Sequence, residues 1–318
     1  MITRTAHRLR TPDDIELSVT ECKVNIHHTV AGDASFAAAA APSIHSSDLA
    51  ASDPDHEQER ACSASMPAAR LSSATRARAR ARKQGRIAII AHPYAPLGGS
   101  QRDATVQRVA QVFLQSGITT YTYDARGAGA SSGKTSWSGK AEILDFQTVA
   151  DWALERQVLA DRECTAAKAE EDGSKKVQVF AAGYSAGSLA ASHYTAPQPH
   201  ETFYLLVSYP LNVRWALSLF ASTSHQEAVR KCVRGSGLLI QGDRDQFTRL
   251  SAYEKWLAEL GKEAERRGVA EDERTDAPSD TGFNSLLVPG ADHFWSSREA
   301  RSRLSSAILD WIDGAIQR

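Results

Sequence analysis

The sequence lacks an excess of charge of either sign. Its 318 residues include 37 Lys and Arg against 38 Asp and Glu, which gives a formal net charge of −1. Strong binding to nucleic acid or to an anionic membrane surface usually needs a clear positive excess. We therefore expect no nucleic-acid partner and no electrostatic attachment to a membrane.

Cysteine and long hydrophobic runs are also scarce. The four cysteines, Cys22, Cys62, Cys164 and Cys232, form no CxxC pair. This scatter is typical of reduced thiols and argues against a disulfide framework or a zinc site. The first residues lack the apolar segment of a secretory signal, and no apolar run approaches the roughly 20 residues that span a bilayer. We expect a soluble, cytoplasmic protein without a membrane span.

The N-terminal residues alternate between apolar and polar side chains over 15–19 and again over 23–27. Period two indicates half-buried strands, so the sequence predicts an antiparallel hairpin near residues 14–29, with residues 1–30 supplying edge strands. Residues 31–85 are rich in Ala, Ser and Arg, and their composition predicts a disordered insertion. The basic run at 76–83 could instead be a nuclear-localisation or RNA-binding patch, but it lacks aromatic residues for base stacking.

From Arg86 onward, short apolar runs alternate with segments of helical period. The runs lie at 87–90, 118–123, 177–181, 203–207, 237–240 and 285–288. Nearly continuous hydrophobicity predicts strands buried on both faces, as in a parallel sheet. Apolar stripes with helical spacing lie at 106–113, 143–154, 253–260 and 304–312. Together they predict one doubly wound α/β catalytic domain over residues 86–318.

The pentapeptide Gly183-Tyr184-Ser185-Ala186-Gly187 follows one of these strands and opens a helix. A tight strand-to-helix turn exposes the serine hydroxyl, and glycine is favoured where flanking side chains would collide. The motif is short, and chance alone yields about 0.1 matches in a chain of this length. Its place between a buried strand and a helix predicts Ser185 as a nucleophile.

A serine nucleophile needs a base and a carboxylate, in the order Ser, Asp or Glu, His in this kind of sheet. Asp245 follows the strand 237–240, and His293 follows the strand 285–288. Asp243 lies in the same loop as Asp245 and competes for the role of orienting carboxylate. The sequence predicts the triad Ser185, Asp245 and His293, and implies no metal or organic cofactor.

The loop after the strand 87–90 is the candidate for the second half of an oxyanion hole. Pro93 and Pro96 have no N–H to donate, which leaves Tyr94, Ala95 or Leu97. We predict the N–H groups of Tyr94 and Ala186 as the two donors, and His92 as a residue that braces the loop.

These residues together resemble the α/β-hydrolase superfamily over residues 86–318. The segment 124–131, Asp-Ala-Arg-Gly-Ala-Gly-Ala-Ser, is similar to that superfamily's D-x-R-G-x-G-x-S turn, which implies a structural role beside the oxyanion hole. The loop 92–99 is similar to the H-P-x-x-P-x-G-G oxyanion loop of small intracellular serine hydrolases, including fungal ones. The resemblance implies an α/β-hydrolase fold, and the superfamily's members cleave esters, thioesters and amides.

The sequence also suggests a small cap over 213–220 and a fairly open cleft. Tyr184, Trp215, Phe220 and Trp295 could give it apolar walls for a small-molecule acyl substrate, although Trp215 and Phe220 could equally be core residues. We interpret the chain as a serine hydrolase that cleaves a carboxylic ester or thioester. The alternatives are a non-catalytic binding protein of the same fold and an amide or peptide hydrolase with the same triad. The sequence leaves the oligomeric state open.

Overall fold

A computed structural model describes residues 1–24, 85–136, 138–166, 176–212, 222–234, 236–272 and 284–317. The predicted insertion at 31–85 lies outside these residues except for Gly85, and the predicted cap at 213–220 lies wholly outside them.

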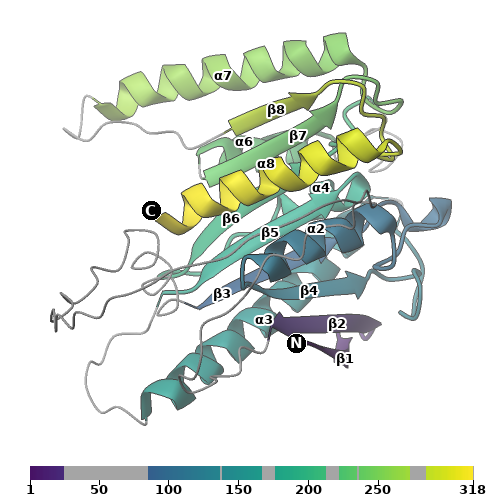
Figure 1. The fold of residues 1–318 in the computed structure, drawn as a ribbon, viewed down its shortest axis with the longest axis vertical. Helices are drawn as coiled ribbons and strands as arrows, with labels where there is room; N and C mark the ends of the chain where they lie inside the picture. Colours follow the sequence, from purple (N-terminus) through teal and green to yellow (C-terminus); the bar gives the residue numbers. More distant parts are fainter. Residues whose placement is uncertain are drawn as a thin grey trace, which may run out of the picture.

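An eight-stranded sheet runs through the molecule in the order β1-β2-β4-β3-β5-β6-β7-β8 (Figure 1). Its strands are β1 (Ile2–Arg10), β2 (Glu16–Val24), β3 (Arg86–Ala91), β4 (Thr119–Asp124), β5 (Gln178–Tyr184), β6 (Glu201–Val207), β7 (Ser236–Gly242) and β8 (Asn284–Val288). The pairs β1–β2 and β2–β4 are antiparallel, and all later pairs are parallel. The predicted sheet, with antiparallel strands at one edge, is confirmed.

The position predicted for the N-terminal hairpin is wrong. Residues 16–24 form one uninterrupted strand, and its partner is β1, which precedes it, with Ile2 opposite Val24 and Arg10 opposite Glu16. The second half of the predicted hairpin mostly falls beyond residue 24, outside the described residues. The sequence of β1 shows no apolar alternation, because most of its side chains are exposed at the edge of the sheet and neither face has to be apolar.

Helices cover both faces of the sheet. On one face, α2 (Ala104–Gln115) and α8 (Arg298–Gln317) pack over the even positions of β3, such as Ala88 and Ile90. On the other face lie α3 (Lys140–Ala166), α4 (Ala186–Ala191), α6 (Ser222–Arg234) and α7 (Leu250–Asp272), over Ile87 and Ile89. Figure 1 shows the central strands between these two layers. Both faces of the central parallel strands are therefore buried, as their unbroken hydrophobicity indicates. The prediction of a buried strand at 285–288 is wrong for most of β8, because only Val288 is buried in this edge strand.

The turn after β4 is held by two buried charged groups. The Asp124 carboxylate accepts hydrogen bonds from the Gln101 backbone N–H and side-chain amide, each at 2.9 Å, and from the Ala130 N–H at 3.1 Å. Two residues later, the Arg126 guanidinium donates to Asp145 on α3 and to Asp13 in the β1–β2 turn, each at 2.6 Å. This ion-pair network joins the N-terminal hairpin, the turn and α3, and it fixes one side of the site described below.

Replacing Asp145 by Ala tests this network. Asp145 is fully buried, and its loss leaves the Arg126 guanidinium and the Arg126 N–H without their main acceptor. We expect the free energy of unfolding to fall by about 3 kcal/mol, because breaking a buried ion pair strands a charge. Urea unfolding measures the change, and Asp13→Ala is the matched control with a half-exposed carboxylate. An equal loss in both variants would contradict the central role given to Asp145.

Candidate active site

Ser185 lies in a strained turn between β5 and α4. Its backbone dihedrals are φ 55° and ψ −122°, which non-glycine residues rarely adopt. A Cβ on Gly183 would lie 2.3 Å from the Gly187 carbonyl oxygen, and one on Gly187 would lie 2.5 Å from the Ala91 carbonyl oxygen. Both flanking glycines are therefore required by close backbone approach, as the sequence pattern predicts.

The structure brings Ser185, His293 and Asp245 into one hydrogen-bonded chain. The His293 Nε2 lies 2.8 Å from the Ser185 Oγ, and its Nδ1 lies 2.7 Å from the Asp245 Oδ2. An ionised carboxylate only accepts, so Nδ1 carries the hydrogen and Nε2 accepts from the serine hydroxyl. The three residues are 3–7% exposed, so the hydrogen-bonded chain is largely shielded from water.

The two carboxylates in the loop after β7 have different partners. The second oxygen of Asp245 accepts the N–H groups of Phe247 and Thr248, at 2.7 and 2.9 Å. Asp243 instead accepts the Gly290 N–H at 2.6 Å and bridges the loops after β7 and β8. The geometry therefore favours Asp245 over Asp243 as the partner of His293.

The backbone of His293 is held at both of its polar groups. The Gln246 side-chain oxygen accepts the His293 N–H at 3.0 Å, and the Tyr184 hydroxyl donates to the His293 carbonyl at 2.8 Å. Gln246 follows Asp245 directly, so the same loop positions the carboxylate and the imidazole. Sequence reasoning missed Gln246, because nothing in its neighbours indicates this contact.

The loop that carries Tyr94 is braced by His92. The His92 Nε2 accepts the Ala125 N–H at 2.9 Å, while Nδ1 lies 2.6 Å from the Pro93 carbonyl, to which it donates. Burial lowers the pKa of His92, which favours the neutral ring that this pattern needs. His92 thus ties the loop after β3 to the turn after β4.

Backbone hydrogen bonds narrow the choice of oxyanion donor. The Leu97 N–H donates to the Tyr94 carbonyl at 3.1 Å and is therefore committed. Within the described part of the chain, the N–H groups of Tyr94, Ala95 and Ala186 have no protein acceptor. Tyr94 and Ala186 also line the same pocket. The assignment of these two donors stays a prediction.

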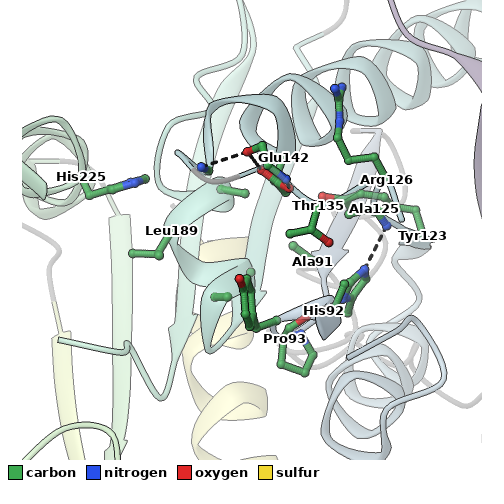
Figure 2. A pocket seen from close by; sticks show the side chains of 17 residues that line it. Ala91, His92, Pro93, Tyr123, Ala125, Arg126, Thr135, Glu142, Leu189 and His225 are labelled. Atoms are coloured by element: carbon green, nitrogen blue, oxygen red, sulfur yellow. Dashed lines mark hydrogen bonds between the residues drawn. The ribbon is translucent and has the colours of Figure 1, made fainter. Parts of the chain in front are cut away.

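A pocket lies between His92 and Leu189 (Figure 2). Tyr94 and Ala186 also line it. It has a cavity volume of about 50 Å³ and lies between the loop after β3, the start of α3, the first turns of α4, and α6. Ala and Gly recur in its wall, and Leu189 adds apolar surface one helical turn after Ser185. Glu142 brings a carboxylate to the opposite side, where it accepts the Ser136 N–H at 2.6 Å. Helical periodicity could have identified Leu189, whereas Glu142 carries no sequence signal.

Two of the predicted cleft walls are wrong. Trp295 is fully buried, and its indole N–H donates to the Ser208 hydroxyl at 3.0 Å. Tyr184 is 2% exposed and packs in the same core as Trp295, and neither lines the pocket. Both instead hold the loop of His293 against the core, Tyr184 through its hydrogen bond to the His293 carbonyl and Trp295 through its bond to Ser208. Trp215 and Phe220, the other two predicted walls, lie outside the described residues.

Neither a metal centre nor a membrane helix appears in the described part of the chain. Within those ranges, no three His, Cys, Asp or Glu side chains gather where they could hold a metal ion. The helices of the same ranges include none long and apolar enough to cross a bilayer.

Comparison with known proteins agrees with this architecture. Residues 98–212 match a family model described as serine aminopeptidase, S33. Over 98% of this chain and 94% of the other, the structure is similar to a serine hydrolase without a lid from Xanthomonas campestris, with 19% identity and a TM-score of 0.55. It is also similar to an esterase from Pyrococcus furiosus, with 14% identity and a TM-score of 0.57 over 98% and 93% of the two chains. No curated protein matches the sequence significantly. The chain has the α/β-hydrolase fold.

Gly187→Ala tests the close approach that shapes the turn. The new Cβ would meet the Ala91 carbonyl oxygen, which is backbone and cannot rotate away. We expect a loss of about 1–3 kcal/mol in the free energy of unfolding, measured in urea. Gly261→Ala is the matched control, because a Cβ there has nothing within 4 Å and helical alanine gains about 0.5–1 kcal/mol over glycine. A Gly187→Ala variant that is more stable than the wild type would show that the turn can accommodate a Cβ atom at this position.

Proposed function

We propose that the chain is a serine hydrolase that cleaves a carboxylic ester or thioester through an acyl-enzyme on Ser185. The observation that carries this proposal is the hydrogen-bonded chain from the Ser185 hydroxyl through His293 to Asp245. The family-model match and the similarity to solved serine hydrolases and esterases support the same class of enzyme.

In the proposed mechanism, the His293 Nε2 removes the proton of Ser185 as the serine oxygen attacks the carbonyl carbon. Asp245 holds the imidazole in the required tautomer and stabilises its positive charge. The N–H groups of Tyr94 and Ala186 donate hydrogen bonds to the carbonyl oxygen as it becomes negatively charged. The positive end of the α4 dipole stabilises the same charge. His293 then gives the proton to the leaving group, and water, activated by the same base, releases the acid.

Amide or peptide cleavage is a second candidate, favoured by the description of the matching family model as a serine aminopeptidase. Both reactions use the same triad, so they differ only in the leaving group that His293 must protonate. Comparing p-nitrophenyl esters, acyl thioesters and aminoacyl p-nitroanilides at equal enzyme concentration separates the two candidates.

Covalent labelling tests the proposed nucleophile directly. A fluorophosphonate probe should label the wild-type protein once, because an activated serine attacks its phosphorus centre. Ser185→Ala should abolish the label while leaving the circular dichroism spectrum unchanged. An unlabelled wild-type protein that also hydrolyses none of these substrates would favour the non-catalytic binding protein.

The two carboxylates of the β7 loop give a second test. Asp245→Asn should lower kcat/KM for a p-nitrophenyl ester by roughly 10³–10⁴-fold, because an amide favours the wrong histidine tautomer. Asp243→Asn changes the same atoms two residues away and should cause a far smaller loss, since Asp243 contacts Gly290 and not His293. A larger effect at Asp243 would reverse the assignment.

A further inference from the structure

Two phenylalanine rings pack against the imidazole of the candidate general base. The Phe247 ring lies 4.4 Å from the His293 ring, and the Phe294 ring lies 5.5 Å from it in an edge-to-face arrangement. The two phenylalanine rings are themselves 6.0 Å apart at 82°. Phe294 is 58% exposed although it follows the buried His293. Phe294 thus presents an apolar ring to the solvent beside the candidate general base.

The proposed mechanism indicates which part of the substrate lies against Phe247 and Phe294. The pocket at Tyr94, Ala186 and Leu189 lies on the side where the carbonyl oxygen is held, and neither Phe247 nor Phe294 lines it. The leaving group must come within hydrogen-bond distance of the His293 Nε2, from which it takes its proton. Its substituent therefore reaches the rings that pack against the imidazole.

We propose that Phe247 and Phe294 form the leaving-group subsite of this hydrolase and that the subsite takes an aromatic alcohol or thiol. Phe294 meets both Phe247 and His293 edge-to-face, which is an arrangement that a further aromatic ring can extend. Both side chains that Phe247 and Phe294 offer to a leaving group are uncharged hydrocarbon rings, so a neutral aryl group suits the subsite better than a charged one. The inference rests on the proposed acyl-enzyme mechanism.

The test compares two esters that share one acyl group. Benzyl butyrate and cyclohexylmethyl butyrate have leaving groups of similar size, but only one is aromatic. The wild-type protein should show the higher kcat/KM for the benzyl ester. Phe294→Leu keeps an apolar side chain and removes the ring, so the benzyl-to-cyclohexylmethyl ratio should fall about two- to tenfold. Phe294→Tyr keeps the ring and should restore the ratio.

A second readout separates a subsite from a merely structural role. Both esters form the same butyryl-enzyme, whose hydrolysis no longer involves the leaving group. Phe294→Leu should therefore slow acylation by the benzyl ester in single-turnover experiments and leave deacylation unchanged. Leu159→Ala, which truncates a similarly exposed side chain on α3, is the control and should change neither rate.

Each outcome has a distinct meaning. Turnover of both esters with no aromatic preference, or a Phe294→Leu ratio equal to that of the wild type, would overturn the subsite and leave the hydrolase intact. Equal slowing of acylation and deacylation with both esters would overturn it as well, because Phe294 would then only hold His293 in place. Absence of turnover and of probe labelling in the wild type would overturn the proposed function, and the subsite with it.

Discussion

The approach of three backbone segments around Gly183 and Gly187 is the constraint on which the site depends. The end of β3, the turn after β5 and the first turn of α4 pass so close that a single added carbon at either glycine would collide with a carbonyl group. The same approach forces Ser185 into its rare dihedral angles. The same close contacts bring the loop of Tyr94 beside the N-terminus of α4. They therefore position both the nucleophile and the candidate oxyanion donors.

Parallel strands supply the remaining residues. The strands β5, β7 and β8 all run in one direction, so their C-terminal loops meet at the same edge of the sheet. Ser185, Asp245 and His293 occupy those three loops, and a further shell of hydrogen bonds fixes their rotamers. In this shell, Tyr184 and Gln246 bind the backbone of His293, and the Thr248 N–H donates to the Asp245 carboxylate. Preorganisation of this kind is what a charge-separated transition state requires.

The sequence predicts the features that arise from short-range chemistry. Buried parallel strands have unbroken apolar runs, and the turn at Ser185 requires glycine, so both appear as local patterns. The sequence fails to predict strand β1, because its side chains are mostly exposed and show no apolar alternation. It also fails for contacts between residues that are distant in the chain. The sequence predicts Trp295 as a cleft wall, yet Trp295 has φ 54° and is buried, and its indole N–H donates to Ser208, which is distant in the chain.

The burial of Trp295 also explains why its neighbour is exposed. Trp295 anchors the loop in the core, so the chain between it and His293 has one residue left, and Phe294 faces the solvent. Under the proposed function, the acyl side would be bounded by the small residues of the pocket wall and by Leu189, whereas the proton-transfer side would be bounded by the rings at His293. The two halves of a substrate would therefore meet different surfaces, and selectivity for one half can vary without disturbing the triad that both share.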